Sequence, residues 1–401
     1  MRNFLQHLTF LLLFVTNILA DSSAKHRTLT GYVVDWEVPK SIPWDKLDYI
    51  NYAFGVPDRS GKLTQFNGNQ LKSVVNDAHN NNKSVCLSVG GWTGSLYFSS
   101  LVRQEESRQS FANNIVQAIE KYDLDGIDID WEYPNSHNGI SCNQNNPQDT
   151  SNFLKFIQLL RSKLDAKFSK QRKRLTAAVS TLVFNDEKQV PFEYLDPAWA
   201  TAFDAIQIMG YDLNGFHNNY TGANAPLYYS GTKHELTVSL ATQLWNRAGI
   251  PYEKMVLGIP FFGYTTLVNK PTATVDGNHQ FFPIDHSQPQ IQADLYDLLE
   301  ADPCPNSTKK SYSGEMQWRS IEQHVLNSSA WQMFFDRDTV TPFAYNKQKA
   351  QFLSFDNPES IKAKIDHVKR YKLGGMMVWS IEMDDKKQTL LNALQDLYKE
   401  D

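Results

Sequence analysis

The sequence predicts an α/β protein: a parallel (β/α)8 barrel with a small α+β insertion between the seventh strand and the seventh helix. Short apolar, β-branched runs recur along the 401 residues, and helical patterns separate them. Eight strands that alternate with helices over a few hundred residues favour a parallel barrel. The spacing breaks once, because more than a hundred residues separate the seventh strand from the eighth.

The expected strands are short runs rich in apolar and β-branched residues. In chain order they lie near Thr30–Val34, Tyr49–Phe54, Val85–Val89, Gly126–Asp130, Leu175–Ser180, Ala205–Met209, Val256–Ile259 and Gly375–Trp379. The expected helices carry apolar residues at helical spacing. They lie near Asn69–Asn80, Gln104–Tyr122, Asp149–Ser169, Leu236–Ala248, Pro358–Leu373 and Thr389–Lys399.

The long segment after the seventh strand is expected to be a compact insertion on the rim of the barrel. It covers residues 266–345, is rich in Asn, Asp, Thr and Pro, and contains a turn signal at Val275–Asn278. Its aromatic residues argue against a disordered loop; they are Phe281, Phe282, Tyr312, Trp318, Trp331 and Phe334. The barrel then comprises residues 21–265 and 346–401. We see no repeat array or linker that would indicate an appended carbohydrate-binding module.

Composition and the N-terminus narrow the classes of function. The formal net charge of −5 gives no basic field, so nucleic acid is not an expected partner. Residues 1–20 are typical of a secretory signal peptide: Arg2 precedes the apolar run Leu8–Val15, and Ala20 ends the segment. The alternative is an uncleaved anchor, but the run is too short to span a bilayer. We expect an exported monomer.

Three cysteines in an exported chain leave one without a partner. Cys86 lies in an expected buried strand and is interpreted as a free core thiol. Cys142 and Cys304 lie in polar loops and are the natural pair for a disulfide. Glycosylation is expected at some of the four Asn-x-Ser/Thr sequons, which begin at Asn82, Asn219, Asn306 and Asn327.

The strongest chemical signal is the row of acids in Asp125-Gly-Ile-Asp-Ile-Asp-Trp-Glu-Tyr-Pro134. Successive side chains of a strand point to opposite faces, so Asp128, Asp130 and Glu132 share one face. Adjacent carboxyls must share protons or donors, which raises the pKa of at least one of them. A glutamate with a raised pKa at the open end of a strand is a candidate general acid. A divalent-cation site is the alternative, but the Gly-centred loop of a calcium site is missing.

Polar and aromatic residues also stand at the carboxyl ends of the other expected strands, where barrel enzymes place their active sites. They are Tyr32, Trp36, Phe54, Ser88, Gly90, Gly91, Trp92, Met209, Tyr211, Asp212 and Trp379. The sequence therefore predicts that these groups converge with the acids on one mouth of the barrel. An aromatic cleft with acids suits stacking of sugar rings.

At this point the chain resembles glycoside hydrolase family 18, the chitinase family with a TIM barrel. The Asp-x-x-Asp-x-Asp-x-Glu pattern is complete as Asp125, Asp128, Asp130 and Glu132. Four further motifs follow the family's order from Gly31 to Asp385; they are Ser88–Gly91, Met209–Asp212, Gly258–Gly263 and Gly374–Trp379. The insertion resembles the α+β insertion of the bacterial-type chitinases.

The resemblance implies a substrate-assisted mechanism without a cofactor or a metal. Glu132 would protonate the glycosidic oxygen, and the substrate's own 2-acetamido carbonyl would attack the anomeric carbon to give an oxazolinium ion. Asp130 would hold the acetamido N–H, and Asp128 would share a proton with Asp130. Tyr211 would donate to the acetamido oxygen. The substrate is then chitin or a chitooligosaccharide rather than cellulose.

The resemblance also assigns the groups that bind sugar. Trp379 would form the floor under the −1 sugar, Tyr133 would border that subsite, and Asp212 would bind near the distorted ring. Trp36 and Trp92 would stack neighbouring sugars, with Tyr32, Phe54 and Met209 at the same mouth. Ser88, Gly90 and Gly91 would be structural helpers, and Asp125, which lies off the parity of the other acids, would be a structural cap.

The chain departs from the family at three positions near the cleft. His217 stands where many relatives have a tryptophan, and Phe262 and Tyr264 replace the commoner Tyr and Arg. Two other functions stay open: a chitin-binding lectin, which typically lacks the acid at the position of Glu132, and an endo-β-N-acetylglucosaminidase that acts on N-glycans. Glu132 argues against the first, and the insertion with the Trp36/Trp92 pair argues against the second.

Overall fold

The computed structural model describes residues 27–231, 236–269, 279–304 and 306–399. The expected signal peptide at residues 1–20 and the turn at Val275–Asn278 lie outside these ranges. No helix in the described part of the chain is long and apolar enough to cross a membrane.

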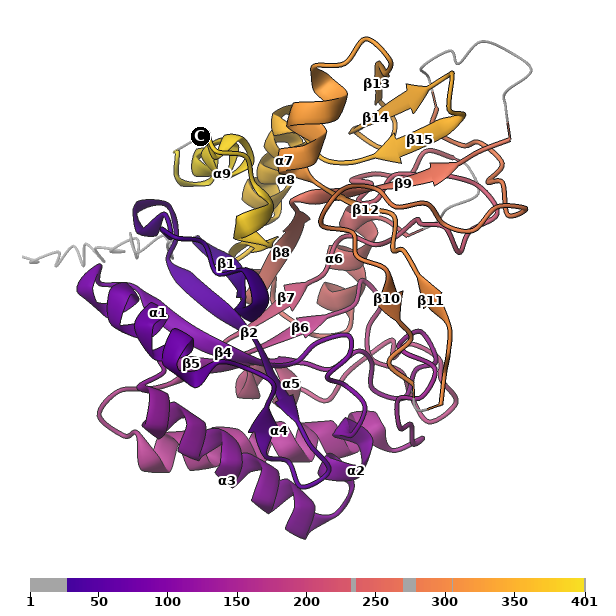
Figure 1. Cartoon of the computed structure of the whole chain (residues 1–401). Coiled ribbons are helices and arrows are strands. Elements are labelled where there is room, and N and C mark those ends of the chain that lie inside the picture. Colours follow the sequence, from indigo (N-terminus) through magenta and orange to yellow (C-terminus); the bar gives the residue numbers. More distant parts are fainter. Residues whose placement is uncertain (1–26, 232–235, 270–278, 305, 400–401) are drawn as a thin grey trace, which may run out of the picture.

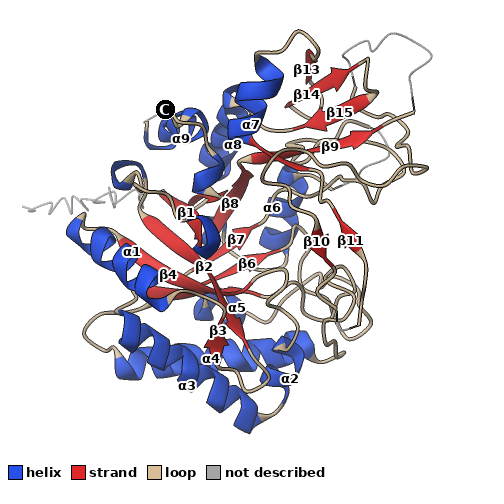
Figure 2. Cartoon of the chain, in the orientation of Figure 1, coloured by secondary structure: helices blue, strands red, loops and turns tan. Residues whose placement is uncertain are grey.

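Eight parallel strands form the closed barrel that the sequence predicts (Figures 1 and 2). The first strand, β1, pairs in parallel with both β2 and β16, and this double pairing closes the sheet. The barrel strands are β1 (Thr28–Val34), β2 (Tyr49–Pro57), β4 (Ser84–Gly90), β5 (Gly126–Asp130), β6 (Arg174–Val179), β7 (Ala205–Ile208), β8 (Met255–Pro260) and β16 (Gly375–Trp379). A short strand, β3 (Leu63–Thr64), pairs antiparallel with the end of β2.

Helices cover the outside of the barrel, as the helix labels around the red strands of Figure 2 show. All six expected helices are present: α1 (Gly68–Asn80), α3 (Glu105–Tyr122), α4 (Asp149–Lys167), α6 (Val238–Arg247), α8 (Pro358–Tyr371) and α9 (Thr389–Leu394). Three short helices of the described residues were not predicted: α2 (Phe98–Arg103), α5 (Ala198–Ala202) and, in the insertion, α7 (Trp318–Ile321). The strand β1 is followed by 3-10 turns at Asp35–Glu37 and Trp44–Lys46.

Side-chain caps fix several helix starts. Asn67 accepts hydrogen bonds from the backbone N–H groups of Asn69 and Gln70 at the start of α1. Asn357 and Ser360 form a reciprocal capping box at the start of α8. The last helix, α9, ends five residues before the expected Lys399 and continues as a 3-10 turn over Gln395–Tyr398.

The insertion lies between β8, the seventh barrel strand, and α8, in the place that the sequence predicts. Its five-stranded antiparallel sheet has the order β12-β9-β15-β14-β13 and lies beside the barrel mouth (Figure 1). The strands are β9 (Phe262–Leu267), β12 (Glu315–Gln317), β13 (Gln332–Asp336), β14 (Thr341–Asn346) and β15 (Gln351–Ser354). The sheet therefore extends beyond the segment 266–345 at both ends. Its own apolar cluster consists of Val268, Phe282, Phe343, Tyr345 and Phe352.

A disulfide connects the two parts of the fold. Cys142, in the loop after β5, is bonded to Cys304 in the insertion, with 5.5 Å between their Cα atoms. Cys304 lies between the two strands of a small hairpin, β10 (Glu300–Ala301) and β11 (Lys310–Ser311). Cys86 is a buried free thiol in β4. The predicted pairing of the cysteines is confirmed.

Candidate active site

The acids occupy one face of β5 and its extension. Ile127 and Ile129 alternate with Asp128 and Asp130 and are fully buried. Trp131 continues the apolar face, and its ring stacks on Phe98 at 5.3 Å between centroids. With the apolar residues packed under the helices, the carboxyls point into the barrel.

Asp128 is held by four side-chain donors from four other barrel strands. Tyr32 and Ser88 donate to its Oδ2 at 2.6 and 2.9 Å. Thr176 and Gln207 donate to its Oδ1 at 2.6 and 2.8 Å. These contacts fix the carboxylate at the centre of the barrel, because charge-assisted hydrogen bonds to an ionised group are the strong ones.

Sequence reasoning missed Thr176 and Gln207. Each is a polar residue inside a buried apolar strand, and both side chains are at most 1% exposed. A polar residue in a strand of this kind indicates a buried hydrogen bond, since a buried polar group needs a partner. The partner itself could not be named, because only barrel closure brings β6 and β7 to Asp128.

Asp130 lies above Asp128 and has a raised pKa. Burial is the main cause, followed by the neighbouring charges of Glu132 and Asp128. Its Oδ1 is buried and accepts no hydrogen bond within the described part of the chain. A buried acceptor of this kind is suited to a donor that a ligand brings.

Glu132 stands two residues beyond Asp130 and is 8% exposed. Burial raises its pKa from 4.5 to about 7; the hydrogen bond from Tyr133 lowers the pKa and the charge of Asp212 raises it. At neutral pH this carboxyl is therefore divided between its acid and base forms, which is the condition for general acid–base work.

The backbone of Glu132 is fixed by two polar side chains. Its N–H donates to Oγ of Ser95 at 2.8 Å, and the Ser95 hydroxyl donates to the carbonyl of Gly91 at 2.9 Å. The Asn143 side chain donates to the Glu132 carbonyl at 2.9 Å. Sequence reasoning missed Ser95 and Asn143 because both lie in loops, where spacing carries no signal.

Gly90 and Gly91 allow the loop after β4 to approach the acid strand. The N–H of Gly91 donates to the carbonyl of Asp130 at 2.8 Å. A Cβ on Gly90 would lie 2.1 Å from that same carbonyl oxygen, and the φ of Gly90 is +114°. No other residue type fits this close approach.

Tyr211 and Asp212 reach the site from the end of β7. Tyr211 is buried, and its hydroxyl lies 3.9 Å from Sδ of Met377. Burial also raises its pKa well above 10, so the hydroxyl stays a donor. Desolvation by the surrounding protein raises the pKa of Asp212 to about 6, and a hydrogen bond from Tyr264 partly offsets this rise. Tyr264 comes from β9, so the insertion supplies part of the site.

Aromatic rings lead outward from the acids along one wall. The Trp379 ring stacks on Phe54, with centroids 5.5 Å apart, and lies 5.4 Å from the ring of Tyr32. Phe54 lies 6.5 Å from Trp36, whose side chain is 68% exposed. Trp92 is exposed as well. The row from Trp379 to Trp36 offers ring faces to an extended ligand.

The other predicted site residues are placed as follows. Tyr133 and Met209 are half-buried at the ends of β5 and β7, and burial raises the pKa of Tyr133. Asp125 lies at the opposite end of β5, where it accepts the N–H of Val85 at 2.8 Å and contacts His79 at 2.9 Å. Within the described ranges, no three His, Cys, Asp or Glu side chains are grouped to hold a metal ion.

Three non-proline cis peptide bonds also lie at this mouth, and nothing in the sequence indicates them. They join Ala53 to Phe54, Glu132 to Tyr133 and Trp379 to Ser380.

Comparison with known proteins agrees with this geometry. The profile of the family described as "Glycosyl hydrolases family 18" matches residues 28–384. The chain belongs to this family and is a glycoside hydrolase.

Among relatives, the chain is similar to a chitinase-like effector of Moniliophthora perniciosa, with 33% identity over 383 residues that cover 91% of this chain and 85% of that protein. A chitinase from Rhizomucor miehei has a crystal structure similar to this one, with a TM-score of 0.88 and 47% identity over 93% of this chain and 100% of that one. An N-acetylglucosaminidase of the same family from Paenibacillus barengoltzii has a TM-score of 0.75 at 26% identity, covering 92% of this chain and 99% of that one.

Proposed function

We propose that the protein is a chitinase that hydrolyses β-1,4 linkages between N-acetylglucosamine units with retention of configuration. One observation carries the proposal. Glu132, with a pKa of about 7, stands next to Asp130, whose buried Oδ1 accepts no hydrogen bond within the described residues. Glu132 supplies the proton donor and Asp130 supplies a hydrogen-bond acceptor, and acetamido participation needs both groups.

In the first step Glu132 donates its proton to the glycosidic oxygen. The acetamido carbonyl of the −1 sugar attacks the anomeric carbon, the glycosidic bond breaks, and an oxazolinium ion forms. Asp130 accepts the acetamido N–H and stabilises the positive charge as it develops. The Tyr211 hydroxyl donates to the acetamido oxygen and orients it for attack.

In the second step water replaces the leaving sugar. Glu132, now ionised, takes a proton from the water, which attacks the anomeric carbon and opens the oxazolinium ring. Asp128 supports both steps from below Asp130. Its four donors hold the Asp128 side chain in place beneath Asp130, where the two aspartates can share a proton.

The cleft wall supports an extended neutral ligand. Trp379 forms the floor under the −1 sugar, with Tyr133 and Met209 at its border. Phe54, Trp36 and Trp92 lie farther along, and Asp212 contacts the distorted ring. A 2-acetamido group is required at the −1 sugar because it supplies the nucleophile, so cellulose and fully deacetylated chitosan are not substrates.

The proposed setting is extracellular. Residues 1–20 act as a signal peptide, and the insertion, whose sheet runs from Phe262 to Ser354, interrupts the catalytic barrel of the mature chain. The Cys142–Cys304 disulfide supports export, because disulfides persist in oxidising compartments. The mature protein works as a monomer, and some of the four sequons are glycosylated.

The name of the Moniliophthora perniciosa relative, a chitinase-like effector, favours a second candidate: a protein that binds chitin without cutting it. A product-versus-time profile on chitin hexamer, beside an N-glycan substrate, separates the alternatives. We expect the wild type to cut the hexamer and spare the N-glycan, while Glu132→Gln binds the hexamer and loses at least ~10²–10⁴-fold in turnover. Binding without any product from the wild type would favour the second candidate, and release of N-glycans would favour the endo-β-N-acetylglucosaminidase.

A further inference from the structure

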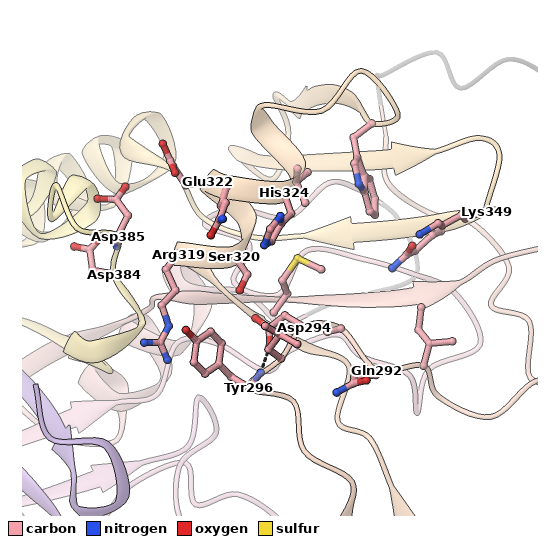
Figure 3. Close-up of a pocket in the computed structure, with 18 of the residues that line it drawn as sticks. Gln292, Asp294, Tyr296, Arg319, Ser320, Glu322, His324, Lys349, Asp384 and Asp385 are labelled. Atoms are coloured by element: carbon pink, nitrogen blue, oxygen red, sulfur yellow. Dashed lines mark hydrogen bonds between the residues drawn. The ribbon is translucent and has the colours of Figure 1, made fainter.

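A cavity of about 1260 Å³ lies in the insertion, away from the catalytic acids (Figure 3). The loop 291–296, the helical segment 318–325 and the strands β9, β12 and β15 line it, and the loop 384–387 after β16 closes one side. In Figure 3, Arg319 and Tyr296 lie next to each other, Ser320 and His324 lie near the middle of the view, and Gln292 and Lys349 lie toward its right side.

The insertion sheet separates this cavity from the catalytic mouth. Tyr264 pairs with Glu315 across β9 and β12, and Tyr264 hydrogen-bonds Asp212 on the catalytic side. Two residues of the same strands line the cavity: Leu267, three residues after Tyr264 on β9, and Met316, one residue after Glu315 on β12. Strand side chains alternate between faces, so the cavity lies on the other face of the sheet.

The cavity nevertheless adjoins the outer end of the aromatic row. The Arg319 guanidinium donates to both carboxylate oxygens of Glu37 at 2.8 Å, and Glu37 directly follows Trp36 in the chain. The same guanidinium lies over the ring of Tyr296, 3.5 Å from its centroid. Tyr296 is 43% exposed and lines the cavity. The Glu37–Arg319 ion pair therefore connects the segment that carries Trp36 to Tyr296 at the cavity.

Most of the charged groups around the cavity already have partners. Asp294 accepts the backbone N–H groups of Gln317 and Tyr296, and Asp384 accepts those of Leu390 and Leu391. Lys387 lies 3.5 Å from Glu322. With these charges satisfied, the lining favours a neutral ligand over an ion.

The remaining lining combines ring faces with hydrogen-bonding side chains. Tyr296 and Trp331 supply the rings, and Gln292, Ser320, Gln323 and His324 supply the polar groups. Stacking faces beside amides and hydroxyls are the chemistry that recognises a polyhydroxylated, N-acetylated sugar.

We propose that this cavity is a distal carbohydrate site, which takes N-acetylated amino-sugar units of a long chain beyond Trp36. The proposal rests on the chitinase function proposed above and extends it. The site would hold polymeric substrate without taking part in bond cleavage. Short substrates that end before Trp36 would not reach it.

The test uses the full mature chain carrying Glu132→Gln, with the catalytic cleft saturated by a thiazoline mimic of the oxazolinium ion. Calorimetry then measures binding of chitin hexamer to the remaining surface. We expect Tyr296→Ala and Trp331→Ala each to weaken this binding roughly two- to tenfold, and Tyr296→Phe to preserve it. Tyr194→Ala is the matched control, because Tyr194 is 67% exposed and does not line the cavity.

The same variants in the active enzyme provide the second readout. We expect Tyr296→Ala and Trp331→Ala to raise KM on long chitin chains, with kcat and the hydrolysis of a disaccharide substrate unchanged. Absence of hexamer binding to the blocked protein, or binding that neither alanine variant alters, would overturn the proposal. A wild type that releases no product from hexamer would instead contradict the chitinase function and leave the calorimetric result interpretable.

Discussion

Raising the pH from 6 to 8 should remove most of the activity by ionising Glu132. With the pKa of this carboxyl at about 7, the protonated fraction falls from about nine-tenths at pH 6 to about one-tenth at pH 8. An ordinary glutamate, with a pKa of 4.5, would be only about 3% protonated at pH 6. The pH of the basic limb of the kcat/KM profile therefore measures how far burial raises the pKa of Glu132.

Two substitutions should move that limb in opposite directions. Asp212→Asn removes a negative charge that raises the pKa of Glu132, so the limb should shift to lower pH. Tyr133→Phe removes a hydrogen bond that lowers the same pKa, so the limb should shift to higher pH. Burial, the largest cause of the raised pKa, is left in place by both changes.

The assay is the initial rate on a soluble chitooligosaccharide at substrate concentrations below KM, between pH 4 and pH 9. Each sample is returned to pH 6 afterwards to show that the enzyme survived the exposure. A basic limb near pH 4.5, or a shift of both variants in the same direction, would refute the assignment of Glu132 and the explanation of its pKa.

Three further outcomes are expected. Gln207→Leu removes one donor from the buried carboxylate of Asp128 and should cost ~1–3 kcal/mol of stability as well as turnover, which urea unfolding and hexamer kinetics would show; unchanged values would mean that the hydrogen bond is dispensable. Cys304→Ser opens a disulfide that spans 162 residues and should lower the unfolding free energy by about 2–5 kcal/mol, and addition of a reductant should then affect the wild type alone. Lys364 and Asp356 form a fully buried ion pair at 2.6 Å, so Asp356→Asn should destabilise by roughly 3–5 kcal/mol, while replacing both residues with apolar ones of similar volume should recover much of that loss.

The barrel was predictable because its signals are local. A parallel strand buried on both faces reads as a short apolar run, and the expected bounds Gly126–Asp130 and Gly375–Trp379 coincide with β5 and β16. The acid row was predictable for the same reason, since alternation within one strand fixes which side chains share a face.

The insertion was less predictable because its sheet is assembled from distant segments. Phe262 and Tyr264 follow the seventh strand closely and look like its continuation, yet they begin β9. At the other end, β15 comes just before α8 and pairs back with β9. Pairings between segments this far apart leave no periodic signal in the chain.

The residues that hydrogen-bond to the acids could not be predicted from the sequence, for a related reason. Thr176, Gln207 and Ser95 are separated from Asp128 and Glu132 by many residues, and their roles follow from the closed barrel. The sequence marks the groups that carry the charge, and the fold supplies the donors that hold them.

The most direct test of the account compares two hexamers in one assay, one N-acetylated at every sugar and one fully deacetylated. Both offer similar rings to the aromatic wall, but only the first carries the acetamido carbonyl that acts as nucleophile. We expect cleavage of the acetylated hexamer alone, with strong inhibition by the thiazoline, because it resembles the charged intermediate. Efficient cleavage of the deacetylated hexamer, insensitive to the thiazoline, would contradict the proposed mechanism and the chitinase function together.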